Sequence, residues 1–527
     1  MALIRRRGGV KVLVVTGLLA AHRVKAEVKA SSVEADVVVL PRPVAALMSL
    51  RYIAEELRRL DLTRYDCVLV PGMIPGDAGL VEERLGVPVF KGPKHASDLS
   101  LVLEALRAGL KLSRVQPACE LLREELRRRA LAELEEAERR AMGLRVGRGR
   151  RGVWVGGGSR IKVAAEVLDA PRLSCEELVA RAARFAEEGA DIIDLGMLSE
   201  DPRPWEVRRL VKAVKRAVGL PVSVDTLDEE EVVEAVKAGA DMVLSVTPEL
   251  AQRFNRVAEV DGYRRVAYVV IPFRPREGPV RGAKRRVEEL LDTVEMLRGF
   301  GARKVIADPL LDPPIAPGCF EALEACRLLK ARRPRLPVML GAGNVTELID
   351  ADSPGVNALL AALAAEVGVD LLLTTEGSVK AEGSVAELAV AVRMMALAKM
   401  RGAPPKDLGI DLLRLKEKRR RDEELHLEGV EEVEAKGDEA LELDPAGSFK
   451  VAVDRARGEL VLVHYRRGEL KPSLVIRGRR AFDLRDEVLR RGLVFSLKHA
   501  FYLGYELAKA ELALKLGRSY VQDEDLA

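Results

Sequence analysis

Two aspartates in the middle of this chain stand where they could bind a ligand. Asp225 closes the β-branched run 222–225, and Asp308 closes the run 305–308. A charge at the end of an apolar run has no packing reason to be there, so both side chains are candidate functional groups. An ionised carboxylate accepts two parallel hydrogen bonds, which suits a flat heterocycle with an amino group beside a ring N–H. We therefore expect Asp225 and Asp308 to bind the donor edge of such a ring.

Histidine and the side-chain amides, which many enzymes use at their sites, are scarce here. The chain of 527 residues has five histidines, three glutamines and three asparagines, and all five histidines fall outside residues 152–402. This distribution excludes histidine catalysis and a histidine-ligated metal from that region, unless another domain reaches in. Asn344 follows Gly341-Ala-Gly, where the backbone can approach a ligand closely, and it is a further binding candidate.

Eight short β-branched runs, each followed by a helical pattern, must position these residues. The runs are 163–167, 191–195, 222–225, 242–246, 267–271, 305–308, 338–340 and 371–374. Eight βα units in about 250 residues are typical of a TIM barrel. Gly-Ala-Asp sequences at 189–191 and 239–241 fit the junctions where a helix ends and the next strand begins. The predicted fold class is α/β, with a central (β/α)8 barrel whose active site lies at the C-terminal ends of its strands.

The end of the last expected strand carries candidates for anion binding. Glu376, Ser378 and Lys380 follow this strand, at a common phosphate-binding position in barrels. Gly377 would let backbone N–H groups turn toward an anion, with Lys380 as the positive charge. Arg274, after the fifth strand, is a second anion candidate.

Asp194 and Asn357 each have a structural alternative. Asp194 lies within the second strand, where it either faces the ligand or accepts hydrogen bonds from neighbouring backbone. Asn357 precedes an apolar helix, and it either caps this helix or faces the same ligand.

We place the barrel at residues 152–402. The segments before and after it form additional domains and linkers. Residues 1–114 alternate short strands with amphipathic helices, which predicts a small α/β domain with a parallel sheet. This domain either has a ligand of its own or acts as a docking or lid domain. We interpret residues 115–151 as a helical linker, residues 403–445 as a charged linker and residues 446–527 as a C-terminal α+β domain.

Composition excludes several classes of protein. The 86 basic and 82 acidic residues leave a net charge of only +4, which argues against a dedicated nucleic-acid binder. We find no uninterrupted apolar stretch of the roughly 18 residues that a membrane span needs. Five scattered cysteines without a CxxC pair fit reduced thiols, so we expect a cytoplasmic protein. A charged fraction of 32% with few amides indicates a thermophilic source.

Four runs in the barrel region carry a family resemblance. The runs Glu188-Gly-Ala-Asp-Ile-Ile-Asp-Leu-Gly196, Pro221-Val-Ser-Val-Asp-Thr226, Ala238-Gly-Ala-Asp241 and Val305-Ile-Ala-Asp-Pro309 together resemble dihydropteroate synthase and the wider pterin-binding barrel family. The resemblance covers residues 160–400 and implies pterin-binding roles for Asp225 and Asp308. The three-part layout, with a Ser519-Tyr-Val-Gln-Asp523 ending, resembles archaeal dihydropteroate synthase-like proteins, which are linked to carbon carriers of the folate or methanopterin type. Barrels of this family are often dimeric.

The chain departs from the synthases at several positions. The synthases usually carry an asparagine motif after the first strand, where Ala165-Glu-Val-Leu-Asp-Ala-Pro-Arg172 stands here, so Glu166 and Asp169 become candidate ligands for Mg²⁺. The family's fourth-strand asparagine falls at Ser245. Gly341-Ala-Gly-Asn-Val-Thr346 replaces a lysine motif and is closer to the corrinoid-linked methyltetrahydropterin methyltransferases of the same superfamily.

The resemblance implies a transferase of folate or tetrahydromethanopterin biosynthesis, which condenses a dihydropterin bearing a pyrophosphate with an arylamine. The implied substrate-binding residues are Asp225, Asp308, Asn344, Asp194, Ser245, Asn357, Glu376 and Ser378. Lys380 and Arg274, with Mg²⁺ as an optional cofactor, would stabilise the departing pyrophosphate. Two alternatives stay open: methyl transfer from a methyltetrahydropterin with a separate corrinoid protein, and a non-catalytic pterin-binding scaffold. The expected partners are these small molecules, without nucleic acid or membrane.

Overall fold

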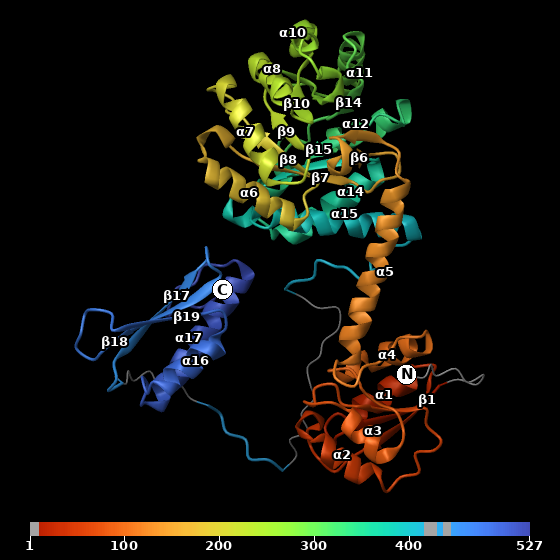
Figure 1. Cartoon of the computed structure of the whole chain (residues 1–527), viewed down its shortest axis with the longest axis vertical. Helices are drawn as coiled ribbons and strands as arrows, with labels where there is room; N and C mark the ends of the chain where they lie inside the picture. The colour runs from red at the N-terminus through yellow and green to blue at the C-terminus, as the bar shows by residue number, and fades with distance from the viewer. Residues whose placement is uncertain (1–9, 416–428, 436–443, 527) are drawn as a thin grey trace. The chain divides into compact units, whose positions relative to one another are not determined.

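The computed structural model describes residues 10–415, 429–435 and 444–526 (Figure 1). The chain divides into two compact units, with the boundary after His426. The basic run at 416–421 lies outside the described residues, as does the acidic run 428–442 except for residues 429–435. In the described ranges, none of the helices has the length and hydropathy that crossing a membrane requires.

Among the described residues, eight parallel strands form the central barrel of the first unit (Figure 1). They are β7 (Lys162–Val167), β8 (Ile192–Gly196), β9 (Val222–Asp225), β10 (Met242–Val246), β11 (Ala267–Val270), β14 (Lys304–Ala307), β15 (Met339–Gly341) and β16 (Leu371–Thr375). The sheet order is β14-β11-β10-β9-β8-β7-β16-β15, and a bridge between Ala307 and Val338 closes the ring. This confirms the predicted (β/α)8 barrel.

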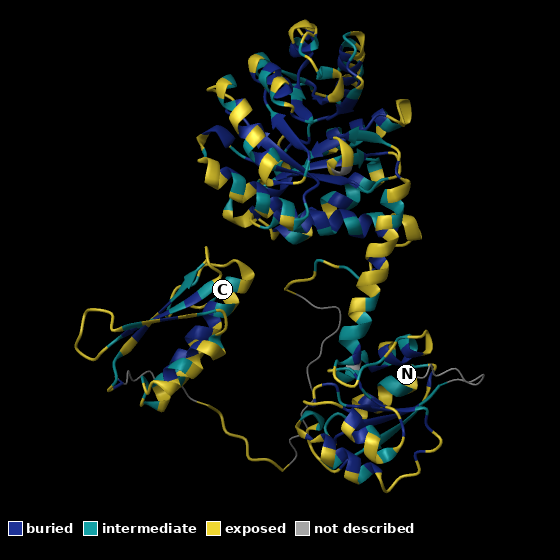
Figure 2. Cartoon of the chain, in the orientation of Figure 1, coloured by how far each residue is buried: buried dark blue, intermediate teal, exposed yellow. Residues whose placement is uncertain are grey.

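Helices cover the outside of the barrel, with their buried faces toward the strands (Figure 2). The longer helices are α6 (Cys175–Glu188), α7 (Pro204–Ala217), α8 (Glu229–Ala238), α11 (Ala283–Gly299), α12 (Phe320–Arg332), α14 (Ser353–Val367) and α15 (Ser384–Arg401). Shorter helices are α9 (Pro248–Gln252), α10 (Asn255–Ala258) and α13 (Gly343–Thr346). Local sequence sets the helix limits: Ser174 and Glu177 form a capping box before α6, and Gly189 ends it at φ 104°.

The Gly-Ala-Asp junctions have a structural explanation. Asp191 accepts a hydrogen bond from the backbone N–H of Val163 at 2.9 Å, and Asp241 accepts one from Val222 at 3.1 Å. Each aspartate therefore ties the start of one strand to the strand beside it. These carboxylates lie at the N-terminal ends of the strands, away from the predicted active site.

Side chains and a small hairpin fill the barrel at the N-terminal ends of its strands. Alternate strand residues such as Ala164 and Ile306 form a buried interior cluster. The antiparallel hairpin of β5 (Leu144–Val146) and β6 (Val153–Val155) contributes to the same cluster. Residues 144–155 thus close the N-terminal end of the barrel, although the sequence analysis assigned residues up to 151 to a linker.

The N-terminal part is a three-layer α/β structure. Its parallel sheet, with the order β2-β1-β3-β4, contains β1 (Lys11–Thr16), β2 (Glu34–Val39), β3 (Cys67–Val70) and β4 (Val89–Lys91). Helices α2 (Leu50–Leu57) and α3 (Gly79–Leu85) pack on one face, and α1 (Ala21–Ala30) and α4 (Leu99–Arg107) on the other. The long α5 (Ala118–Arg140) follows, and its Glu133 pairs with Arg401 at 2.9 Å.

The C-terminal unit has the predicted α+β composition. Its antiparallel strands are β17 (Ser448–Asp454), β18 (Glu459–Tyr465) and β19 (Leu474–Gly478), and its helices are α16 (Ala481–Arg490) and α17 (Leu497–Leu516). The Ser519–Asp523 ending has a structural role. Gln522 bonds to the backbone of Val451 and Phe449, and Asp523 accepts a hydrogen bond from Tyr502 at 2.6 Å.

Candidate functional site

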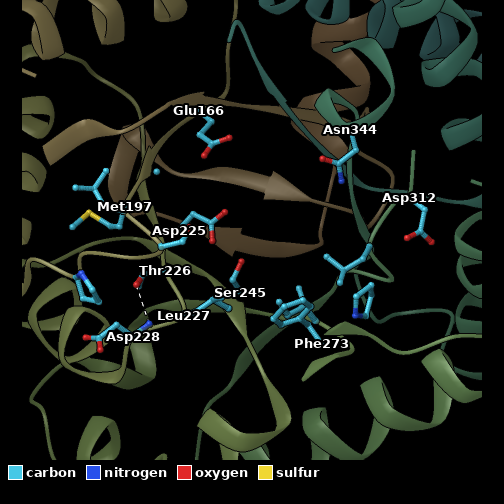
Figure 3. A pocket seen from close by; sticks show the side chains of 17 residues that line it. Glu166, Met197, Asp225, Thr226, Leu227, Asp228, Ser245, Phe273, Asp312 and Asn344 are labelled. Atoms are coloured by element: carbon cyan, nitrogen blue, oxygen red, sulfur yellow. Dashed lines mark hydrogen bonds between the residues drawn. The ribbon is translucent and has the colours of Figure 1, made fainter. Parts of the chain in front are cut away.

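A cavity of about 380 Å³ opens at the C-terminal ends of the barrel strands (Figure 3). Its polar lining includes Glu166, Asp225, Ser245, Asp312 and Asn344. Its apolar lining includes Met197, Leu198, Leu227, Ile271 and Phe273. Glu166 and Asp225 extend into the cavity from one side, and Asn344 and Asp312 from the other. Apolar walls around a few polar groups suit a flat ring with a hydrogen-bonding edge.

Three carboxylates converge at one side of this cavity. Glu166, Asp194 and Asp225 each bring an oxygen within 4.8 Å of the others. They come from the adjacent strands β7, β8 and β9, and the strand register places Glu166 beside Asp194. Gly196 leaves space for Glu166, because a Cβ atom at this position would lie 2.4 Å from Glu166 Oε1. The missing side chain of Gly196, in the Asp-Leu-Gly run, therefore makes room for the carboxylate cluster.

Asp194 is fully buried at the base of the carboxylate cluster. The hydroxyl of Ser223 donates to its Oδ1, whereas its Oδ2 has no hydrogen-bond partner among the described residues. A buried carboxylate oxygen without a partner is costly, so a proton or a cation between the three carboxylates would stabilise the site.

Burial and mutual repulsion hold protons on these carboxyl groups. Burial, followed by the charge of Asp225, raises the pKa of Glu166 to about 8. The same two causes raise the pKa of Asp194 well above its ordinary range. Burial also raises the pKa of Asp225, while the hydrogen bond with Ser245 lowers it. At neutral pH and without a cation, the cluster therefore keeps at least part of its protons.

Asp308 is buried beside a stretch of unusual backbone, and Ser245 itself has such a backbone. Asp308 follows β14, is 4% exposed, and accepts a hydrogen bond from Leu310 N–H at 2.8 Å. Burial raises the pKa of Asp308 to about 7. Ser245 has φ 64° and Leu310 has φ 60°, in the left-handed region that non-glycine residues rarely adopt, and both residues line the cavity. Strained backbone of this kind gathers at functional sites.

Asn344 and Asp312 form the opposite side of the cavity. The Asn344 amide donates to the backbone oxygen of Leu311 at 2.7 Å, which fixes the orientation of the side chain. Asp312, a strand-end residue to which the sequence assigned no role, is 6% exposed and pairs with the fully buried Arg286 and with Arg281. The available signal was its position in the same loop as Asp308, four residues later.

Comparison with known proteins places the chain in a family. Three family matches cover most of it: residues 168–375 match the pterin binding enzymes, residues 443–523 match PterinBD-DUF4346, and residues 10–94 match a family of unknown function (DUF6513). An uncharacterized protein of Methanocaldococcus jannaschii is 37% identical over 537 residues, which span 98% of this chain and 99% of that protein. The chain belongs to this family of dihydropteroate synthase-like pterin-binding proteins.

Dihydropteroate synthases themselves are more distant from this pterin-binding protein. The Bacillus subtilis synthase is 26% identical over 147 residues, 26% of this chain and 51% of that enzyme. The structure of the Thermus thermophilus synthase in complex with 6HMPPP has 25% identity and a TM-score of 0.37, and covers 46% of this chain and 95% of its own. A Yersinia pestis synthase with a sulfonamide drug has 16% identity and a TM-score of 0.40, and the match covers 49% of this chain and 100% of that structure's chain.

The expected anion site after β16 is not assembled in the pterin-binding protein. Glu347 accepts hydrogen bonds from the backbone N–H groups of Gly377 and Ser378, at 2.8 and 3.3 Å, and from the Ser378 hydroxyl. An internal carboxylate thus occupies the turn that we expected to receive a phosphate. Lys380 is turned to Asp350 at 2.9 Å, and Glu376 pairs with Arg184 at 2.8 Å.

Arg274 and Asp169 are also engaged away from the cavity. Arg274 pairs with Glu289 at 3.1 Å and with Glu277, so its charge is balanced within the protein. Asp169 is exposed and pairs with Arg172 at 3.0 Å. The structure therefore puts Glu166 with Asp194 and Asp225, and does not put Asp169 among the candidate metal ligands.

Asn357 belongs to the wall of the barrel and not to the cavity. It is fully buried within α14, accepts a hydrogen bond from Thr346 and donates one to Glu387, each at 3.0 Å. The family resemblance implied substrate binding, and the alternative was a cap before the helix; Asn357 instead lies inside α14, whose N-cap is Asp352.

Replacing Asn357 by alanine should therefore destabilise the fold and leave ligand affinity unchanged. Loss of its amide removes the hydrogen bond that the buried Glu387 carboxylate accepts from Asn357, which costs about 1–3 kcal/mol. Chemical denaturation would measure the first effect and dihydropterin titration the second. A large loss of dihydropterin affinity in a folded N357A variant would restore the binding assignment.

Proposed function

We propose that this pterin-binding protein condenses an activated dihydropterin with an arylamine, in the synthesis of a folate-type or methanopterin-type carrier. The observation that supports this most is the cavity of the barrel, where carboxylates face a slot with apolar walls. A dihydropterin ring presents an amino group and a ring N–H on one edge and flat apolar faces. Asp225 accepts from this donor edge, with Asn344 opposite, whereas Asp308 is buried after β14 and is not among the described residues that line the cavity.

The residues of the site position the two reactants. Asn344, held by Leu311, contributes an amide oxygen, and Phe273 and Met197 pack against the faces of the ring. Holding the pterin methylene in reach of the arylamine is the main catalytic contribution of the protein. An arylamine attacks as the neutral free base, so no strong base is needed and the absence of histidine from the described cavity lining is no obstacle.

We also propose Mg²⁺ as a cofactor held by Glu166, Asp194 and Asp225. Three converging carboxylates with an unpartnered buried oxygen fit a hard divalent cation that prefers oxygen ligands. When bound, the cation would supply positive charge against a pyrophosphate leaving group. This ligand set replaces the pair Glu166 and Asp169 that the sequence suggested.

Divalent cations should stabilise the protein through this cluster. We expect Mg²⁺ or Mn²⁺ to raise the unfolding midpoint at pH 8 relative to EDTA, because cation binding to the folded state adds to its stability. The Asp194→Asn variant should lose most of this increment, and Asp169→Asn, which also removes one carboxylate, should keep it. An equal increment in all three proteins would contradict the assignment.

Methyl transfer from a methyltetrahydropterin to a separate corrinoid protein is a second candidate. One observation favours it: among the described residues that line the cavity, none is lysine, arginine or histidine. A methyltetrahydropterin carries no pyrophosphate, so its reaction needs no cation there.

The decisive experiment supplies both sets of substrates. The protein is incubated with dihydropterin methyl pyrophosphate and either 4-aminobenzoate or its ribosyl derivative, and released pyrophosphate is measured. Release that depends on the amine supports the synthase. Dihydropterin binding without release, together with methyl transfer to a reduced corrinoid, would replace the synthase with the second candidate.

A further inference from the structure

A basic segment of the chain adjoins residues that line the cavity. The short hairpin of β12 (Phe273–Arg274) and β13 (Gly278–Pro279) contributes Phe273 and Pro279 to the cavity lining. The hairpin continues directly into α11, which begins at Ala283. The segment 273–286 holds six basic residues and one acidic residue, Glu277. We call four of the six, Arg276, Arg281, Lys284 and Arg285, the basic lip.

The two remaining basic residues of the segment have structural roles. Arg286 is fully buried and donates to the backbone oxygens of Val280, Pro309 and Leu310, which ties the hairpin to the loop after β14. The Arg274 guanidinium donates to both oxygens of Glu289 on α11. These contacts fix the hairpin against the barrel.

The four lip residues are exposed and carry surplus charge. The side chains of Arg276, Lys284 and Arg285 form no hydrogen bond or ion pair with any described residue. Elsewhere, helix arginines such as Arg209 and Arg298 pair with a glutamate one turn away. Arg285 has Glu289 in that position, but Arg274 already occupies this carboxylate.

Arg281 is surplus for a similar reason. Its only ion pair among the described residues is with Asp312 Oδ1 at 3.2 Å, while the buried Arg286 already holds Asp312 Oδ2. The charge of Asp312 is therefore balanced without Arg281. Since Asp312 lines the cavity, this contact also places Arg281 at the cavity edge.

The charge distribution separates two regions for a ligand. Without a bound cation, the carboxylates of the cavity repel an anionic group, whereas the basic lip attracts one. Guanidinium groups bind phosphate oxygens through paired hydrogen bonds, which makes arginine well suited to this role.

We propose that the basic lip binds the phosphate group of a substrate whose ring occupies the barrel cavity or lies above it. This inference rests on the proposed function and assigns the anion site to the hairpin and α11, in place of Lys380 and Arg274. The phosphate comes either from the pyrophosphate of the dihydropterin or from a phosphate on the arylamine.

The test removes the charge of the lip in the full-length protein. The variant Arg276→Gln/Arg281→Gln/Lys284→Gln/Arg285→Gln is compared with Arg303→Gln, an exposed arginine that precedes β14 at the opposite end of the barrel. Inorganic pyrophosphate is the first probe, titrated at low ionic strength, where exposed charges act most strongly. We expect the lip variant to bind it at least about tenfold more weakly, because it loses the charge-assisted hydrogen bonds to the phosphate oxygens. Arg303→Gln should bind as the wild type does.

Two further arms distinguish the source of the phosphate. One compares 6-hydroxymethyl-dihydropterin with its pyrophosphate ester, and the other compares an arylamine with its phosphorylated form. If the lip variant loses affinity for only one of the two phosphorylated ligands, that ligand is the source of the phosphate. Either outcome supports phosphate binding by the basic lip. Equal pyrophosphate binding by the lip variant and the wild type, or none by either, would overturn the proposal. Failure of both dihydropterins to bind the wild type would instead overturn the proposed function.

Discussion

Replacing Asp225 by asparagine is expected to abolish dihydropterin binding without weakening the fold. Asn keeps the shape of the side chain but turns one acceptor oxygen into a donor, which then faces the donor edge of the pterin. Loss of two charged hydrogen bonds, at about 1.5–3 kcal/mol each, should reduce affinity by about 100-fold or more. The substitution also removes one of three crowded carboxyl groups, so the unfolding midpoint should stay equal or rise.

Titration of dihydropterin by fluorescence or calorimetry, with chemical denaturation beside it, would measure both effects. Asp169→Asn is the matched control, because it makes the same chemical change on an exposed side chain that pairs with Arg172. Unchanged affinity in D225N would remove the central assignment of the site. A strongly destabilised D225N variant would show that the aspartate has a structural role instead.

The stability of the metal-free protein should fall as pH rises from about 5 to 9. The pKa of Glu166 is about 8 in the folded protein against an ordinary value of 4.5, and the pKa of Asp308 is about 7 against 3.8. Between the ordinary and the raised value, the folded state holds protons that the unfolded state has released. Raising the pH therefore favours unfolding, and the stabilisation is lost as pH passes through the raised values.

Glu166→Gln should make this pH profile shallower. We expect the variant to be more stable than the wild type at pH 9, by an amount on the order of 2 kcal/mol, and to differ less at pH 5. Denaturation midpoints from pH 5 to 9 in the presence of EDTA would show the difference. A wild-type profile that is flat or rises with pH would mean that Glu166 is ionised in the folded protein.

The fold could be predicted because its signals are local. Short β-branched runs, glycines at helix ends and their regular repetition along the chain depend on neighbouring residues only. The same holds for Asp225, which closes a strand and lines the cavity. Asp308 also follows a strand end, but it is buried and is not among the described lining residues. The hairpin of residues 144–155 was not predicted, because its strands are short and nothing local in the sequence shows that they pack into the interior cluster of the barrel.

The partners of charged side chains could not be predicted in the same way. Lys380 and Arg274 looked available for an anion, but their partners Asp350 and Glu289 are brought to them by the tertiary fold. Glu347 reaches the turn at Gly377 from 30 residues away. Residue types indicate what a site can do, and the fold determines which charges remain free to do it.

The hairpin of β5 and β6 has a consequence for the order of events in the cavity. The hairpin and the interior cluster fill the barrel at the N-terminal ends of its strands. Ligands therefore enter and leave the described cavity through the same opening, at the C-terminal ends. A ring that reaches Asp225 must arrive before any second substrate that lies above it. For a two-substrate reaction at this site, the steady-state pattern should be compulsory-order addition, with the pterin first and the condensed product leaving last.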